Sequence, residues 1–197
     1  MFRLKVLYLS VLSPMLLLLV LLSCSNSSDD KSEMSQEEKI ARGKYLVTAG
    51  SCHDCHSPKI MTPQGPIVDT SRALSGSPSA TVIRDVDPQL VQPGMWYLFV
   101  QDLTAAVGPW GASFSANLTP DNETGIGSWQ EEMFINALRT GKHLGVGRPI
   151  MPPMPWEFIG KFSDEDLKAI FAYLKSLKPV KNKVPENIPP DKLFAKK

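Results

Sequence analysis

The sequence predicts a mainly α-helical domain of three or more helices, with one long insertion that is not helical. Three segments combine apolar residues at helical spacing with clear end signals: residues 36–49, 129–140 and 163–177. Residues 58–115, by contrast, are rich in Pro, Gly and Ser and follow no helical period. We therefore expect a long loop or a small β-hairpin in that stretch.

The first helix is expected at residues 36–49. Ser35 is a suitable N-cap residue, and Glu38 three positions later completes a capping box. Gly43 lies on the apolar face of the segment. Because glycine carries no side chain, another helix can approach closely at this position.

The other two helices are expected after the insertion. Residues 129–140 lie between Ser128, a capping residue, and Gly141, a helix stop signal. Residues 163–177 carry the strongest signal, because Ser163 and three acidic residues open the segment and a continuous apolar stripe follows.

The insertion contains one segment with strand character. Residues 57–93 are predicted as loop. Residues 95–100 are aromatic and β-branched, and together with residues 103–107 they predict a hairpin that turns at Gln101-Asp102. A short helix also fits this segment.

The run Cys52-His53-Asp54-Cys55-His56 is the most informative part of the chain. C-x-x-C-H is the attachment pattern for a c-type haem, in which two thiols bond covalently to one porphyrin. The histidine after the second cysteine is then placed under the iron as its proximal ligand. The motif therefore predicts one covalent haem c on Cys52 and Cys55, with His56 as an iron ligand.

Two other interpretations of the cysteine pair are a redox disulfide and part of a zinc site. A redox disulfide of the thioredoxin kind would need alternating strands and helices around the motif, which the pattern does not offer. A zinc site needs four ligands, and the chain has only His53, His56 and His143 and no second cysteine pair.

Residues 1–23 have the basic start and apolar run of a signal peptide. This segment ends in Leu21-Leu22-Ser23-Cys24, which resembles the lipobox of bacterial lipoproteins. That resemblance implies lipidation of Cys24 and a membrane anchor on the periplasmic or outer-membrane face, and not a cytoplasmic location. An ordinary signal peptide or an uncleaved membrane anchor is the alternative. Residues 24–36 are polar and are expected to be a flexible tether.

All three cysteines are thereby assigned, and none remains for a structural disulfide. The formal net charge is +1, so no basic excess indicates nucleic acid as a partner. Residues 37–180 are expected to form the domain, and residues 181–197 a Lys/Pro-rich, extended tail.

An electron-carrying haem needs a second axial ligand, and methionine is the usual one because its thioether stabilises ferrous iron. The Pro-rich segment before the last helix contains Met151 and Met154. Met154, which is followed by a proline and an aromatic residue, is the predicted ligand. Met151 and His143 are the alternatives, and the methionine that does not bind iron is expected to pack against the porphyrin.

Further runs agree with this interpretation: Ala41-Arg42-Gly43-Lys44-Tyr45-Leu46, Asn117-Leu118-Thr119-Pro120-Asp121, Trp129, Met154-Pro155-Trp156 and Ala172-Tyr173-Leu174. With the C-x-x-C-H motif, they make residues 38–180 resemble a class I cytochrome c domain. The chain is similar to the single-haem units in the cytochrome c subunits of membrane alcohol and gluconate dehydrogenases. Those subunits carry three units, whereas this chain has one, and its stretch 58–115 is longer than in a minimal cytochrome.

The resemblance implies a cytochrome c fold in which the first and last helices cross nearly perpendicularly, with Gly43 against Tyr173. It also implies that the loop at Asn117 and the Trp129 ring lie near the haem edge. We expect the Nδ1–H of His56 to be held by a backbone carbonyl, that of Pro58 or a neighbour.

The sequence thus predicts an exported, membrane-anchored monohaem cytochrome c that passes single electrons between redox proteins, such as a dehydrogenase, an oxidase or another cytochrome. It would be an electron carrier rather than an enzyme, and no residue needs to act as acid, base or nucleophile. The alternatives are a peroxidase-like haem enzyme with a labile sixth ligand and an electron-transfer subunit of a dehydrogenase complex. Four lysines late in the chain could offer a docking surface to an acidic partner, or simply a solvated helix end: Lys175, Lys178, Lys181 and Lys183.

Overall fold

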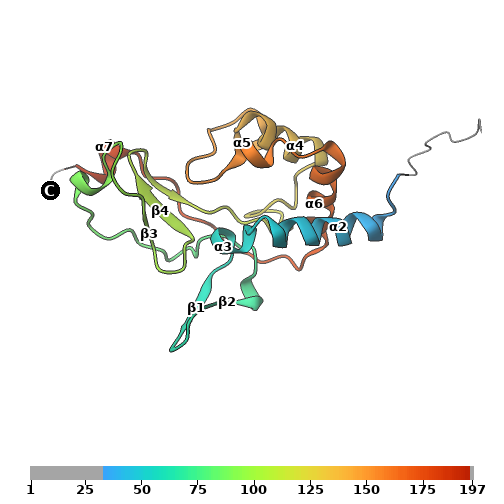
Figure 1. Ribbon diagram of the computed structural model, residues 1–197, viewed down its shortest axis with the longest axis horizontal. Helices are drawn as coiled ribbons and strands as arrows, with labels where there is room; N and C mark the ends of the chain where they lie inside the picture. The colour runs from blue at the N-terminus through green and yellow to red at the C-terminus, as the bar shows by residue number, and fades with distance from the viewer. Residues whose placement is uncertain (1–32, 196–197) are drawn as a thin grey trace, which may run out of the picture. The chain divides into compact units, whose positions relative to one another are not determined.

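The structure, a computed structural model, describes residues 33–195. The signal segment 1–23, Cys24 and most of the predicted tether lie outside these residues. The unit that starts at Ser35 contains all of the elements discussed below (Figure 1). Within residues 33–195, no helix combines the length and the apolar composition that crossing a bilayer requires.

The first and last predicted helices are confirmed with their caps. Helix α2 (Gln36–Ala49) opens with a capping box in which Ser35 and Glu38 bond each other's backbone N–H groups. Helix α6 (Asp164–Ser176) opens with the Ser163 hydroxyl accepting from the backbone N–H of Asp166 at 3.1 Å.

The middle helix, α4 (Glu131–Thr140), starts two residues later than predicted. Its N-cap is Gln130, not Ser128, because the Trp129 N–H bonds the Ile126 carbonyl at 3.0 Å and holds a turn there. The helix ends at Gly141 as expected, where φ is +66°. This left-handed conformation is easily adopted by glycine and ends the helix.

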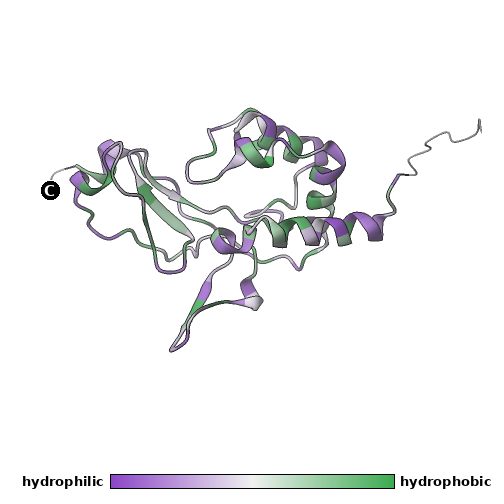
Figure 2. Cartoon of the chain, in the orientation of Figure 1, coloured by the Kyte–Doolittle hydropathy of each residue, from purple (hydrophilic) through white to green (hydrophobic). Residues whose placement is uncertain are grey.

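Helices α2 and α6 pack directly on each other at Gly43. A Cβ atom at this position would overlap the carbonyl of Ala169 and approach the Cβ of Tyr173 to 2.8 Å. The expected contact between Gly43 and Tyr173 is therefore confirmed. The main core is formed by buried side chains of α2, α4, α6 and two loops: Val47, Leu74, Ile126, Phe134, Leu138, Leu167, Ile170, Phe171 and Leu174. Figure 2 shows that the C-terminal half of α2 is its more hydrophobic half.

The insertion contains two small antiparallel sheets. The predicted hairpin is confirmed as β3 (Leu98–Phe99) and β4 (Ala105–Gly108), and a third strand that was not predicted, β5 (Gly111–Phe114), pairs with β4. The second sheet is a hairpin of β1 (Lys59–Thr62) and β2 (Gly65–Val68). The prediction of loop at these positions was wrong.

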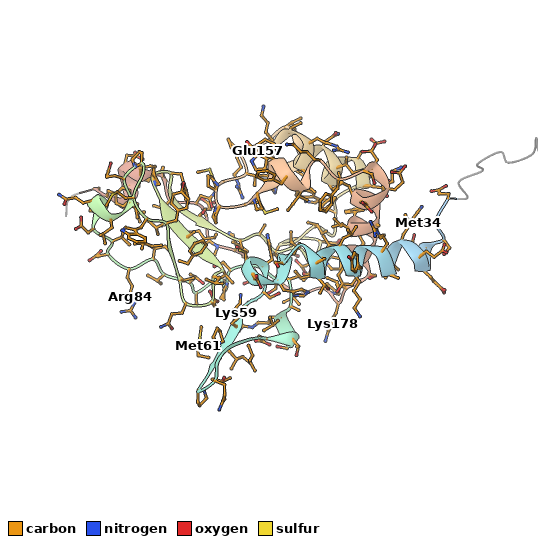
Figure 3. The ribbon with its side chains drawn as sticks, viewed as in Figure 1. Met34, Lys59, Met61, Arg84, Glu157 and Lys178 are labelled. Carbon is orange, nitrogen blue, oxygen red and sulfur yellow. The ribbon has the colours of Figure 1, made fainter. Side chains whose placement is uncertain are left out.

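The residues of these strands explain why the sequence did not predict them. The first three residues of β5 are Gly, Ala and Ser, which have weak strand propensity and are buried nonetheless, so that only Phe114 favours a strand. In the β1–β2 hairpin, adjacent residues in each strand are exposed, so the period-2 pattern of a half-buried strand is absent. Figure 3 shows Met61 on this projecting hairpin and Lys59 near its base. The Lys59 ammonium donates to the carbonyl of Asp102 at 2.6 Å and so ties the base to the β3–β4 turn.

Three short helices complete the fold: α3 (Cys52–His56), α5 (Trp156–Ile159) and α7 (Pro190–Leu193). Three 3-10 turns accompany them at Thr70–Arg72, Pro88–Val91 and His143–Gly145.

The described part of the predicted tail, residues 181–195, packs onto the three-stranded sheet. Ile188 forms a β-bridge with Ala112, and a second cluster of buried side chains gathers Val91, Val107 and Ala112 beneath Ile188, Leu193 and Phe194. Much of this segment is extended, as expected, but apolar contacts hold it against the sheet and α7 ends it.

Candidate haem site

The short helix α3 brings the two cysteines and the histidine of the motif together. Ser51, with φ of +55°, separates α3 from the end of α2. Because Cys52, Cys55 and His56 are three and four residues apart in a helix, they share one of its faces. Both thiols are free and half-buried, and burial raises their pKa values, so both are neutral at neutral pH.

The His56 ring is buried and its orientation is fixed by one hydrogen bond. Its Nδ1 lies 2.8 Å from the carbonyl oxygen of Ala116, which can only accept, so Nδ1 carries the proton. The expected acceptor at Pro58 was wrong: the carbonyl comes from the segment that follows β5. Burial lowers the pKa of His56, which favours the neutral ring and leaves Nε2 with a lone pair for a metal.

A cavity of about 700 Å³ lies beside α3 and is lined by Cys55 and His56. Its walls include the sheet, with Ala105, Ala106 and Phe114, and α4, with Phe134 and Leu138. Loop segments within residues 115–129, 148–155 and 183–187 form the rest, together with His143. Cys52 does not line this cavity and packs against the main core instead. The volume falls within the usual range for small-molecule and cofactor sites.

Both candidate methionines line the cavity. Met154 and Met151 lie in one turn, where the Met154 N–H donates to the Met151 carbonyl at 3.3 Å. The turn is fastened to β5, because the Ser113 hydroxyl donates to the carbonyl of Pro152 at 2.6 Å. The structure therefore brings both methionines to the same cavity as His56, so either residue is near enough to be a candidate ligand.

His143, the third candidate ligand, also lines the cavity. Its ring packs edge-on against Trp129, with 5.0 Å between the ring centroids. Burial and the nearby Arg148 charge lower the pKa of His143. Trp129 and Asn117, which the resemblance associates with the haem edge, line the same cavity.

Asn117 also has a structural role. Its amide donates to the Val180 carbonyl at 2.8 Å, and its carbonyl accepts from the Thr119 hydroxyl at 2.7 Å. Asn117 thus joins the loop after β5 to the segment that follows α6.

The residues present fit a c-type haem. Two thiols and a histidine share one helix face, the cavity is largely apolar, and the donor set near it is an imidazole with thioether sulfurs. Elsewhere in residues 33–195 no three His, Cys, Asp or Glu side chains cluster so that they could hold a metal ion.

A C-x-x-C-H helix beside an apolar cavity of cofactor size is the arrangement of a protein that binds a c-type haem covalently. A family model described as cytochrome c matches residues 40–178. The chain therefore belongs to the cytochrome c family.

Curated relatives of the chain include components of several dehydrogenases. It is 40% identical over 148 residues to a nicotinate dehydrogenase component of Pseudomonas putida, and 31% identical over 157 residues to the gluconate 2-dehydrogenase cytochrome c subunit of Pantoea cypripedii. It is 29% identical over 155 residues to the cytochrome c subunit of the quinone alcohol dehydrogenase of Gluconobacter oxydans. These matches cover 75%, 80% and 77% of this chain but only 9%, 26% and 25% of the relatives.

Three features of the site were not apparent from the sequence: the Ala116 carbonyl, the fastening of Pro152 to β5, and the wall formed by residues 183–187. The first two are backbone carbonyls, which carry no signature in a sequence. The third lies in the segment predicted as a tail.

Proposed function

We propose that the chain is an exported, membrane-anchored monohaem cytochrome c that transfers single electrons between redox proteins. The observation that carries this proposal is the arrangement around one cavity, which is lined by His56, with its Nδ1 already hydrogen-bonded, and by two methionines. A histidine and a methionine as axial ligands suit electron transfer, because they leave no open position for a substrate at the iron.

Each residue of the site has a distinct task in this proposal. Cys52 and Cys55 would hold the porphyrin through thioether bonds, and His56 would bind the iron through Nε2. Met154 would supply the sulfur ligand, with its turn held by Ser113. When bound, the haem supplies the one-electron redox chemistry, while the apolar walls keep water away from it.

The class of redox partner is suggested by the relatives. Two of the three are named as cytochrome c subunits of dehydrogenases that act on gluconate and on alcohols. We therefore place a dehydrogenase first among the partners, ahead of an oxidase or another cytochrome. The aligned part of this chain corresponds to about a quarter or less of those proteins, so the match supports the class of partner and not a substrate.

The four late lysines do not support a uniform docking surface. The Lys175 ammonium donates to the Gly127 carbonyl and lies 5.6 Å from the centre of the Phe171 ring. Lys181 pairs with Glu123 at 2.7 Å. Since two of the four charges are held by their own chain, we do not extend the proposal to this cluster.

Membrane attachment would depend on lipidation of Cys24, with the polar residues that follow it as the tether to the domain. We expect a location on the periplasmic side or at the outer membrane. Replacement of Cys24 with Ser should move the protein from the membrane to the soluble fraction of the producing bacterium. Retention at the membrane would contradict the lipid anchor without bearing on the haem.

The experiment for the haem function is to produce the full chain in a bacterium able to attach haem c. The mass of the denatured protein should exceed that of the polypeptide by one haem, and Cys52→Ser and Cys55→Ser should each lose one covalent link. The ferrous protein should bind CO slowly, because the sixth position is filled. Rapid binding would instead favour a haem enzyme with a labile ligand.

A further inference from the structure

The segment after α6 forms part of the cavity wall. We call residues 180–188 the C-terminal strap. Five consecutive strap residues, 183–187, line the cavity and belong to no helix or strand. Because Lys183 and Glu186 in this segment are also exposed, the strap lies between solvent and a site that, in the proposed function, depends on exclusion of water.

Hydrogen bonds hold the strap at its two ends. At one end, the backbone N–H of Val180 donates to the Thr119 hydroxyl at 3.1 Å. At the other, Ile188 exchanges two backbone bonds with Ala112, at 2.8 and 2.9 Å. Among the described residues, no hydrogen bond holds residues 183–186, so their position depends on the anchors on either side.

Asn182 is the anchor next to this unsupported stretch. Its side-chain amide donates to the carbonyls of Ser75 and Ser77 at 2.8 and 2.9 Å, and its side-chain oxygen accepts from the N–H of Ser79 at 3.1 Å. Its backbone N–H donates to the Thr124 hydroxyl at 3.0 Å. The amide group of this one side chain thus bonds, through both its nitrogen and its oxygen, to a loop more than 100 residues away in the sequence.

We propose that Asn182 is a positioning residue for the redox site: it pins the strap over the cavity and thereby keeps water from the bound haem. This inference rests on the proposed function. A haem in a drier site has a higher reduction potential, because water stabilises the ferric state with its extra charge. Release of the strap would therefore lower the potential while leaving the axial ligands in place.

The test compares haem-loaded, full-length wild type with Asn182→Ala and with the control Asn136→Ala, which truncates an exposed asparagine on α4. Hydrogen exchange is followed at the amides of Val180 and Asn182, and the reduction potential is measured by spectroelectrochemistry. Loss of three side-chain hydrogen bonds should speed this exchange roughly 10- to 1,000-fold. The reduction potential of Asn182→Ala should fall, while its far-red sulfur-to-iron band should remain. Asn136→Ala should have the exchange rates and the reduction potential of the wild type.

Unchanged exchange in Asn182→Ala would overturn the assignment of Asn182 as the anchor. Faster exchange with an unchanged potential would overturn the role of the strap. If Asn182→Ala does not fold, Asn187→Ala tests the strap in its place. This variant removes a single hydrogen bond, which the Asn187 side chain accepts from the Phe114 N–H at 3.3 Å. It should speed the exchange and lower the potential by smaller amounts. A wild-type protein without a reversible one-electron potential would contradict the proposed function itself, so the two failures are distinguishable.

Discussion

The Nδ1 of His56 lies 2.8 Å from the carbonyl oxygen of Ala116, a residue sixty positions further along the chain. This bond makes the orientation of the predicted iron ligand depend on the end of the insertion, because Ala116 lies two residues after the last strand, β5. The neighbouring backbone is held in turn, since the Ser115 N–H bonds the Thr104 carbonyl and the Leu118 N–H bonds the Leu74 carbonyl. The insertion thus helps to hold His56 in place and also lines part of its cavity.

Replacement of each candidate axial ligand should identify the one that binds iron. We expect Met154→Ala to abolish the far-red sulfur-to-ferric charge-transfer band and to lower the reduction potential, because a thioether stabilises ferrous iron. Met151→Ala and His143→Ala are the matched controls, since both side chains line the same cavity, and both should keep the band. If the band survives Met154→Ala and disappears in Met151→Ala, the assignment is wrong.

Replacement of Ser57 with Ala should destabilise the segment that follows the haem motif. The buried Ser57 hydroxyl accepts from the N–H of Leu74 at 2.9 Å and lies 2.9 Å from Nδ1 of His53. Its loss leaves a buried N–H without a partner, which costs about 1–3 kcal/mol of unfolding free energy. Urea unfolding of the haem-loaded protein measures this, with Ser79→Ala at an exposed position as the control. Equal stability of the two variants would show that the hydroxyl is not needed.

Replacement of Gly43 with Ala should force the first and last helices apart. The added Cβ would overlap the Ala169 carbonyl, which belongs to the backbone of α6 and cannot rotate away. Overpacking of this kind costs about 1–3 kcal/mol, more than alanine gains over glycine through helix propensity. The control is Lys44→Ala, at the adjacent exposed position of α2, which should change the unfolding free energy by less than about 0.5 kcal/mol.

Ionisation of Asp121 should make the free energy of unfolding change with pH in the acid range. Its carboxylate accepts from the Thr124 hydroxyl at 2.6 Å and from the Thr124 N–H at 2.8 Å, and these bonds hold the pKa of Asp121 below its usual value. A weaker bond from the Glu123 N–H and the charge of Lys181 act in the same direction. A carboxylate with a depressed pKa stabilises the fold above its unfolded pKa, and this contribution is lost as the pH falls through the folded value.

The free energy of unfolding of the wild type should therefore decline as the pH falls below about 4. The free energy of unfolding of Asp121→Asn should decline less steeply over the same range. Urea titrations between about pH 5 and 2.5 measure how the unfolding free energy of each protein changes with pH. Asp191→Asn is the control, because it removes a carboxylate outside this loop. Identical slopes for wild type and Asp121→Asn would contradict the expectation.

The parts of this molecule that the sequence predicts well are those specified by near neighbours in the chain. Ser35 with Glu38, and Ser163 before α6, mark helix starts because the cap and its N–H partner are three residues apart. The C-x-x-C-H motif is local in the same way, since one helical turn brings its three functional side chains together.

The parts that the sequence does not predict depend on partners far away or on backbone groups. Trp129 was expected in a helix, but a turn stabilised by the Ile126 carbonyl delays the start of α4. Asn182 looks like one polar residue in a Lys/Pro-rich tail, and only the fold brings it to the carbonyls of Ser75 and Ser77. The β5 strand forms although three of its four residues have weak strand propensity, because tertiary packing buries those three.

The most direct test of the central claim is a spectroelectrochemical titration of the full-length, haem-loaded chain. The account predicts a single reversible one-electron transition, with a low-spin ferric spectrum whose far-red sulfur-to-iron band disappears on reduction. A high-spin ferric spectrum without that band would show that the position opposite His56 is not occupied by a methionine. It would contradict the assignment of this protein as an electron carrier with two filled axial positions.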